Sequence, residues 1–203
     1  MLNLLVWLGV LAPFFYIIYG IVQLTLLGNI FYFGPEPGQY ILEWMGQSAL
    51  AMLFVTLAIS SAHRLWALPI VRYRRRLGVS TFFYALGHLL AFAVFILGLD
   101  LTLLVQEIIK RPYILVGMTA LVLLTLLAVT SLHALKRRLA YRWIQLHRLV
   151  YWVAGLGVLH YVWQIRDGYF LFDFYLLLLV LLLAERVKAK KVFNPFAGRK
   201  TTY

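Results

Sequence analysis

Three histidines lie within long apolar stretches of the sequence. His88 is part of YALGHLLAF, and His147 and His160 are part of RWIQLHRLVYWVAGLGVLHYVW, residues 142–163. The thirteen residues from His147 to His160 correspond to about 20 Å along an ideal helix and to about 140° around its axis. We therefore expect one imidazole near each end of a membrane-spanning helix. Only a tilted or locally altered helix would turn both imidazoles toward one partner.

The other ionisable residues limit what these imidazoles can do. All seven acidic residues lie at predicted helix ends or in loops, whereas a proton relay normally has carboxylates inside the membrane. Zinc needs three or four converging ligands, and a chain without cysteine cannot form Fe–S clusters or a covalent CxxCH haem attachment. Haem iron needs only one or two axial imidazoles, an apolar slot, and cations near its propionates. Haem fits these residues best, and the alternative is a set of buried imidazoles hydrogen-bonded to carbonyl or hydroxyl groups.

Six long apolar runs must position the histidines. The chain is 64% hydrophobic with a mean hydropathy of +0.87, and each run is close to the ~20 residues that cross the hydrocarbon core as a helix. We expect an all-α membrane protein of one domain, residues 1–203, built as a six-transmembrane-helix bundle with a polar cytoplasmic tail at about 187–203. The first run lacks the basic leader and cleavage site of a signal peptide, so we interpret it as a retained helix. The runs are residues 2–27, 48–62, 77–105, 112–135, 143–165 and 169–185.

Breaks in the apolar pattern mark where helices begin and end. Residues 33–40, FGPEPGQY, indicate a Pro/Gly loop before the second helix, and Pro69 marks the turn after it. Asp100 interrupts the third run, so that helix is expected to end near Leu99, with LTLLVQEIIK as a short amphipathic helix at the membrane interface. Pro112 suits the first turn of the fourth helix, where its missing N–H costs little.

The basic residues predict the topology. The net charge is +12, and sixteen of the nineteen Lys and Arg residues lie between the second and third helices, around the fourth-to-fifth connection, or after the sixth helix. Short cytoplasmic loops carry the Lys/Arg excess, so both termini are expected in the cytoplasm, with the basic segments near membrane lipid. This distribution argues against a nucleic-acid-binding surface. The lack of an internal sequence repeat argues against an inverted-repeat transporter.

Three longer segments carry a resemblance to a known family. They are RRRLGVSTFFYALGHL, KRPYILVG and VTSLHALKRRLAYRWIQLHRLVYWVAGLGVLHYVW. Over roughly residues 40–190, the chain resembles the haem-binding membrane subunits of bacterial periplasmic protein-methionine-sulfoxide reductase systems. These subunits belong to the ferric-reductase-like transmembrane domains, which are related to the membrane part of NADPH oxidases.

The resemblance implies that histidines on the third and fifth helices are axial ligands of haem b. It assigns this role to His88, His160 and His147. In the related oxidases each of these two helices carries a pair of histidines, and two haems stack between them, whereas the third helix here carries only His88. We expect His88 and His160 to hold the outer haem. A second, inner haem on His147 is left open, so the number of haems is one or two.

Arg74 lies where the missing inner ligand would be, fourteen residues before His88 and within about 40° of the same helix face. Because arginine stays protonated, it is a better partner for a haem propionate than for iron. The other ligand of an inner haem is therefore unassigned. His63 and His133, expected at the inner ends of the second and fourth helices and solvated by headgroups, are candidates that the family pattern does not supply.

The resemblance also implies a function in the bacterial inner membrane. Electrons from the quinone pool or from a reduced flavin would pass through haem to a periplasmic molybdopterin-containing methionine sulfoxide reductase subunit, which repairs oxidised envelope proteins. The chain lacks a dinucleotide-binding glycine motif, so a quinol or an external flavin reductase must supply the electrons. Relatives are also described as binding FMN. Arg72, Arg75 and Arg137 are candidate contacts for its phosphate, although topology explains such arginines more simply.

Two other functions stay open at this point. A membrane oxidoreductase of the same superfamily would pass electrons to ferric iron or oxygen, and co-purification with a molybdenum subunit would separate it from the first function. A non-haem channel or transporter would use the histidines to sense pH or to bind a cation. A colourless preparation after adequate haem supply would favour this last function.

Overall fold

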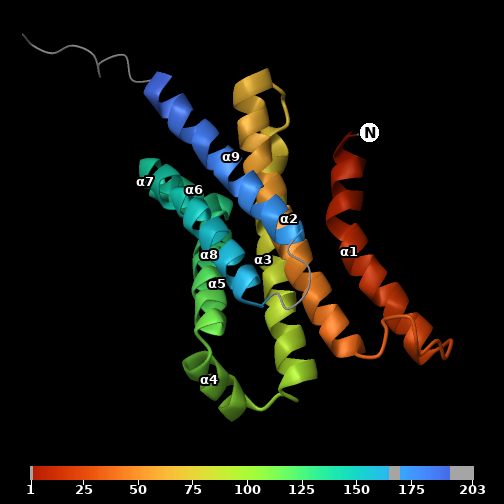
Figure 1. The fold of residues 1–203 in the computed structure, drawn as a ribbon. Coiled ribbons are helices and arrows are strands. Elements are labelled where there is room, and N and C mark those ends of the chain that lie inside the picture. Colours follow the sequence, from red (N-terminus) through yellow and green to blue (C-terminus); the bar gives the residue numbers. More distant parts are fainter. Residues whose placement is uncertain (1, 165–169, 193–203) are drawn as a thin grey trace, which may run out of the picture.

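The computed structural model describes residues 2–164 and 170–192, and within these residues the chain is helical and has no β-strand (Figure 1). The all-α fold expected from the sequence is thus confirmed for this part of the chain. Three short segments have other helical geometries: the 3-10 turns η1 (Val71–Tyr73) and η3 (His147–Leu149), and the π-helical turn η2 (Phe92–Ile96). The α-helices are α1 (Leu2–Thr25), α2 (Pro37–Trp66), α3 (Arg74–Ala91), α4 (Leu101–Lys110), α5 (Pro112–Thr130), α6 (His133–Leu139), α7 (Tyr141–Leu146), α8 (Val150–Gln164) and α9 (Phe170–Val192).

Within the described residues, four helical segments are long and apolar enough to cross a membrane: α1, α2, Val71–Ile96 and α5. The other two predicted spans are helical but differ in form. The fifth is divided into α7, η3 and α8. The longest uncharged stretch of α9 covers residues 174–184, which is shorter than the ~20 residues that a span requires. A helical membrane protein is therefore supported by four segments, and six spans stay a prediction.

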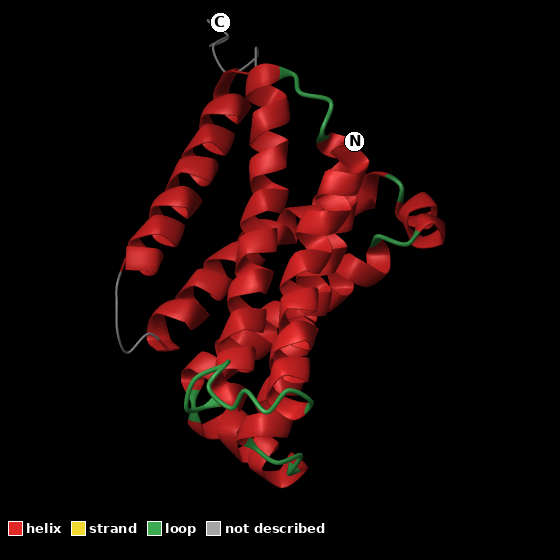
Figure 2. Ribbon diagram, turned by 90° about the vertical axis from the view of Figure 1, so that its right-hand side faces the viewer, coloured by secondary structure: helices red, strands yellow, loops and turns green. Residues whose placement is uncertain are grey.

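The long segments alternate in direction along the bundle (Figures 1 and 2). The start of α1, the α2–α3 connection, the short helices α6 and α7, and the end of α9 lie toward one end, which we call the basic end (Figure 1). Helix α4 lies at the opposite end, which we call the α4 end. Two termini on one side of a membrane require such an alternation. Which side the basic end faces stays a prediction.

The core forms around α2. Leu53 and Phe54 of α2 are buried in one cluster with Val153 and Ala154 of α8, which are almost completely inaccessible. Helix α2 packs along α3, and α5 packs along α8. Direct packing between the backbones of α3 and α8 is slight. The two helices that carry His88 and His160 are thus each supported by a different neighbour.

Several helix boundaries agree with the sequence-based predictions. Helix α3 continues into η2, and Gly98 and Leu99 then have φ values of 59° and 65°, which end the helix in the left-handed region. The Asp100 carboxylate caps α4 by accepting hydrogen bonds from two backbone amides, at 2.8 and 3.0 Å. Pro112 begins α5. The predicted break near Leu99, the short helix after it and the proline start are all confirmed.

Other boundaries differ from the prediction. Helix α2 begins at Pro37, inside the predicted loop 33–40, because proline suits the first helical position. Helix α5 ends at Thr130, short of the predicted residue 135, because Leu132 has an extended backbone and a separate helix, α6, begins at His133. In the predicted tail, residues 187–192 continue α9, and residues 193–203 lie outside the described part of the chain.

Candidate functional site

The structure brings the imidazoles of His88 and His160 together. His88 projects from α3 and His160 from α8, and their ring centroids are 6.0 Å apart with an interplanar angle of 88°. The two residues are 72 positions apart in the sequence, so only the tertiary fold creates this pair. This is the pair that the sequence analysis expected to hold the outer haem.

Each of the two imidazoles is oriented by a backbone carbonyl on a neighbouring helix. The Nδ1 atom of His88 is 2.8 Å from the carbonyl oxygen of Leu42 in α2. The Nδ1 atom of His160 is 2.7 Å from the carbonyl oxygen of Tyr113 in α5. A carbonyl oxygen only accepts hydrogen bonds, so each Nδ1 carries the proton and donates it. The Nε2 atoms then keep their lone pairs, which is the tautomer that binds a metal through Nε2.

Two glycines provide the space in which the imidazoles lie. A Cβ atom added to Gly46 of α2 would lie 2.8 Å from Nδ1 of His88, and one added to Gly117 of α5 would lie 2.8 Å from Nδ1 and Cε1 of His160. Each glycine follows the carbonyl-bearing residue by four positions, which is one helical turn. A side chain at that position would cover the carbonyl. The lack of a side chain therefore leaves each carbonyl open to the approaching imidazole.

The spacing of the two rings fits one metal ion. Bonds from a metal to imidazole nitrogen are about 2 Å long, so two rings that share a metal have centroids about 6 Å apart. Among the described residues, no group of three or more His, Asp or Glu side chains converges on a common point. A metal at this pair would thus receive two protein ligands, and haem supplies its own four porphyrin nitrogens. In ligand type, tautomer and ring spacing, the residues present therefore fit the iron of a bis-histidine haem.

Tyr113 is itself fixed at the α4 end of the bundle. Its hydroxyl accepts a hydrogen bond from the Arg111 guanidinium at 3.0 Å, and Arg111 also forms an ion pair with Glu107. The hydrogen bond to Tyr113, together with the nearby Glu107 charge, raises the pKa of Arg111 above its usual value. Arg111 therefore stays charged and holds the first turn of α5 against the end of α4.

His147 lies apart from this pair, in the 3-10 turn η3 near the basic end. The locally altered helix that the sequence analysis considered is thus present between α7 and α8. The Nδ1 atom of His147 is 3.1 Å from the carbonyl oxygen of Trp143, and its Nε2 atom is 3.3 Å from Oγ of Ser131. The ring also stacks on the Trp143 indole, at 3.9 Å between centroids. Both ring nitrogens of His147 thus have protein partners.

Arg74 lies at the start of α3, at the same end of the bundle as His147. Its side chain is partly buried, and no hydrogen bond or ion pair of Arg74 is present among the described residues. The nearby Arg64 differs, because it is paired with Glu185 of α9 at 2.9 Å between Nε and Oε1. Among the described residues, Arg74 is therefore a partly buried cation at the basic end that has no carboxylate partner.

The remaining histidines and arginines named from the sequence lie at the basic end. Nδ1 of His63 is 2.8 Å from the carbonyl oxygen of Leu68, and Nε2 of His133 is 2.7 Å from Nη1 of Arg75. Neither His63 nor His133 forms a contact with His147 of the kind seen between His88 and His160. Arg72 stacks over the ring of Tyr73. Arg137, together with His133, lines a shallow hollow beside α6 and α7.

Residues 43–158 match the family described as ferric reductase like transmembrane component. The chain belongs to this family. A relative within it is the protein-methionine-sulfoxide reductase heme-binding subunit MsrQ of Ralstonia nicotianae, which is 41% identical over 161 residues, covering 78% of this chain and 71% of the relative. No solved structure matches the chain. The resemblance expected from the sequence is thus confirmed.

The ferric-reductase-like segment contains most of the described site. It includes Gly46, His88, Gly117 and His147 and ends shortly before His160. Sequence reasoning identified the histidines but missed the two glycines and the two carbonyls. The carbonyls have no signature in the side-chain pattern. The glycines do have a signature in the sequence. Gly117 lies inside a predicted apolar helix and Gly46 just before one, each at the same depth as a histidine on the neighbouring helix.

Proposed function

We propose that this protein is a haem b electron-transfer subunit of a protein-methionine-sulfoxide reductase system in the bacterial inner membrane. The observation that carries the proposal is the pair of His88 and His160, with both Nδ1 atoms bound to carbonyls and a spacing that suits one iron. The family match and the name of the Ralstonia nicotianae relative support the same function. The pair is surrounded by helices, as expected for a carrier that exchanges electrons with partners at the surface.

In the proposed site, His88 and His160 hold the haem iron through their Nε2 atoms. The haem, when bound, supplies one-electron transfer between ferric and ferrous iron. The chain supplies the orientation. The carbonyls of Leu42 and Tyr113 fix the tautomer and raise the basicity of each imidazole, and the glycines Gly46 and Gly117 allow the rings to approach. A more basic ligand favours the ferric state, so these carbonyls would lower the reduction potential.

A second haem near the basic end is part of the proposal, as an inner site on His147. Its support is Arg74, a partly buried arginine that has no carboxylate partner within the described part of the chain. A haem propionate would supply the opposite charge. Binding of iron at Nε2 of His147 requires the loss of the 3.3 Å contact with Ser131, which is longer than most hydrogen bonds that a hydroxyl makes. The opposing ligand is unassigned.

The proposed electron path runs from a donor at the basic end to an acceptor at the α4 end. The donor is the quinone pool, directly or through a reduced flavin. If the flavin is FMN, its phosphate would lie near Arg75 and Arg137, which both approach His133, rather than near Arg72, which stacks on Tyr73. The acceptor is a periplasmic molybdopterin-containing subunit that reduces methionine sulfoxide.

The test of the haem assignment is a pyridine haemochrome assay and a reduced-minus-oxidised spectrum of purified protein and variants. We expect the His88→Ala and His160→Ala variants each to lose one low-spin b-type haem per chain. The control is Gln106→Ala, at an exposed position of α4 that belongs to no proposed haem site, and it should keep the full haem content. An intact low-spin spectrum in His88→Ala would refute the assignment.

The His147→Ala variant tests the inner site. It should lose a second haem only if the unaltered protein holds one there.

The acceptor is tested by reoxidation of the dithionite-reduced protein. Purified methionine sulfoxide reductase catalytic subunit with methionine sulfoxide should oxidise the haem faster than ferric citrate or dissolved oxygen does. Faster oxidation by ferric citrate or oxygen would instead favour a reductase of the same family with another acceptor. A colourless protein after adequate haem supply would contradict both.

A further inference from the structure

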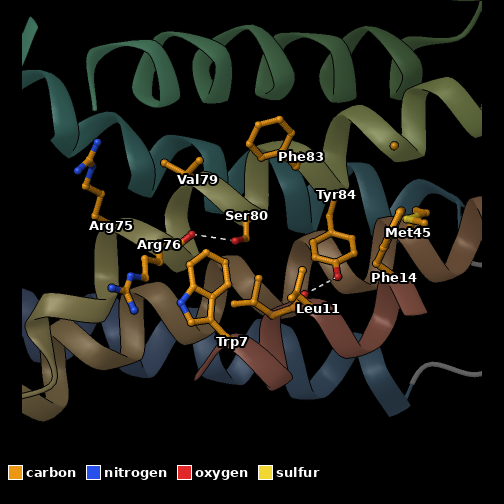
Figure 3. Close-up of a pocket in the computed structure, with 12 residues that line it drawn as sticks. Trp7, Leu11, Phe14, Met45, Arg75, Arg76, Val79, Ser80, Phe83 and Tyr84 are labelled. Atoms are coloured by element: carbon orange, nitrogen blue, oxygen red, sulfur yellow. Dashed lines mark hydrogen bonds between the residues drawn. The ribbon is translucent and has the colours of Figure 1, made fainter. Parts of the chain in front are cut away.

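A groove runs between α1 and α3 (Figure 3). Its volume is about 550 Å³, and its walls come from α1, from Met45 of α2 and from α3 between Arg75 and Gly87. Most wall residues are apolar. Figure 3 shows Trp7 and Phe14 of α1 on one wall, and Phe83 of α3 on the other. Phe83 and Phe14 are exposed, at 62% and 47% of their surfaces, so the groove opens to the surrounding lipid.

One end of the groove carries positive charge that no carboxylate of residues 2–164 or 170–192 balances. Arg75 and Arg76 line this end. Arg75 approaches the imidazole of His133, and Arg76 donates to the side-chain amide oxygen of Asn3 and lies 5.4 Å from the ring of Trp7. None of these partners is a carboxylate. The ion pairs found within the described residues involve other arginines, Arg64 and Arg111.

The indole N–H of Trp7 lies at the arginine end of the groove, beside Arg76, and away from that end the hydroxyl groups that line the groove already donate to backbone carbonyls. The Ser80 hydroxyl donates to the carbonyl oxygen of Arg76 at 2.9 Å, and the Tyr84 hydroxyl donates to the carbonyl oxygen of Val10 at 2.5 Å. A ligand with a carbonyl headgroup, such as a quinone ring, would find no donor in this part. Only the arginine end can bind a polar head. The chemistry therefore selects an amphiphile with an anionic head at that end and an apolar chain in the interior.

The length of the groove suits one acyl chain. The eleven residues from Arg76 to Gly87 correspond to about 16 Å along α3. This is about half of the ~30 Å hydrocarbon core, which is the depth of one leaflet. A phosphate at Arg75 and Arg76 would place an acyl chain along Val79 and Phe83, down to Gly87.

We propose that this groove binds one anionic phospholipid, with its phosphate at Arg75 and Arg76 and one acyl chain between α1 and α3. The bound chain joins α1 to the rest of the bundle, where the protein itself provides few contacts. Among these are two hydrogen bonds, from Tyr84 to Val10 and from Trp44 to the carbonyl oxygen of Pro13. The proposal is independent of the haem and of the electron acceptor, but it shares Arg75 with the FMN phosphate contact proposed above, so the two phosphates would compete for this arginine.

The test uses native mass spectrometry of the whole protein, released from nanodiscs of phosphatidylcholine with a minor fraction of phosphatidylglycerol. We expect one retained phosphatidylglycerol per chain, well above its share of the nanodisc lipid. The double variant Arg75→Gln/Arg76→Gln should retain it roughly 25-fold less strongly, since each arginine near an anionic headgroup contributes about fivefold. The matched control, Arg137→Gln/Arg138→Gln, removes two arginines of α6 that do not line the groove and should retain it fully.

A second variant keeps the test valid if the double variant folds poorly. Val79→Trp fills the groove and leaves both arginines in place, and it should also lower retention, with an unchanged far-ultraviolet circular dichroism spectrum. Equal retention of phosphatidylcholine and phosphatidylglycerol by the unaltered protein would overturn the proposal. So would undiminished phosphatidylglycerol retention in both the double variant and Val79→Trp, or a retained quinone in place of the lipid.

Discussion

At the residue scale, each site histidine is fixed by the same arrangement of three groups. His88 donates through Nδ1 to the Leu42 carbonyl and lies against Gly46, and His160 repeats this relation with Tyr113 and Gly117. The glycine and the carbonyl are one helical turn apart in both cases. A methyl group at either glycine would occupy the space of the imidazole. These glycines are therefore positioning residues for any ligand that the imidazoles bind.

We predict that Gly46→Ala and Gly117→Ala each disturb the adjacent imidazole. The added Cβ would lie 2.8 Å from ring atoms of His88 or His160, which is far inside normal contact distance, so the ring must move and its bond to the carbonyl must lengthen. Overpacking of this kind costs about 1–3 kcal/mol. Haem per chain should fall, and the midpoint potential of the remaining haem should rise, because the imidazole loses its hydrogen-bonded carbonyl.

Gly155→Ala is the matched control for these two variants. Gly155 also lies inside a helix, α8, but an added Cβ there would have no neighbouring atom within 4 Å. This variant should keep the haem content and the potential, and alanine should stabilise the helix by about 0.5–1 kcal/mol. An unchanged potential in Gly46→Ala and Gly117→Ala would show that the glycines do not position the histidines.

At the element scale, the sequence predicted the helices better than their contacts. The break at Asp100 and the start at Pro112 follow from local chemistry, because a cap or a proline acts on the next few residues. The pairing of His88 with His160 was expected from the resemblance alone. Depth along the helices did not decide it, because His88 falls between the two histidines of the fifth apolar run.

The contacts that hold the site could not be predicted from side chains. The acceptors for His88 and His160 are backbone carbonyls, and every helical residue has one, so no residue type marks them. A locally altered helix was considered for the fifth run, but its place at His147 could not be predicted, because the residues around it are all compatible with a continuous helix. The glycines were visible in the sequence, but their role depends on which helices are neighbours.

We predict that Asp100→Ala loosens α4 without unfolding the bundle. The Asp100 carboxylate accepts hydrogen bonds from the amides of Thr102 and Leu103, and loss of such a cap costs about 1 kcal/mol. Hydrogen exchange followed by mass spectrometry should show faster exchange in peptides from α4, with no change in peptides from α2.

The control is Gln106→Ala, an exposed site on the same helix, and it should leave the exchange of the first turn of α4 unchanged. Equal exchange in the two variants would show that the cap does not stabilise α4.

At the scale of the whole molecule, most of the basic residues lie toward one end of the bundle, and the His88–His160 pair lies toward the other. The connections that carry most of the basic residues lie at the same end as the start of α1 and the end of α9, and α4 lies at the other end (Figure 1). The His88–His160 pair lies toward the α4 end, since Leu42 and Tyr113 are both near the first turns of their helices. A basic end in the cytoplasm would therefore put this pair nearer to the periplasm, on the side of the proposed acceptor.

This orientation predicts the labelling of single cysteines, and the absence of native cysteine makes the experiment direct. Gln106→Cys places a thiol on α4, and Ala134→Cys places one on α6, both at exposed positions. A membrane-impermeant maleimide added to intact spheroplasts should label Gln106→Cys. It should label Ala134→Cys only after the membrane is opened, because the Lys/Arg excess keeps that end in the cytoplasm.

The reverse pattern would place His88 and His160 near the cytoplasm and would make a direct periplasmic acceptor for this pair untenable. Labelling of both cysteines in intact spheroplasts would show that α4 and α6 lie on the same side, which would contradict the alternation of the long segments.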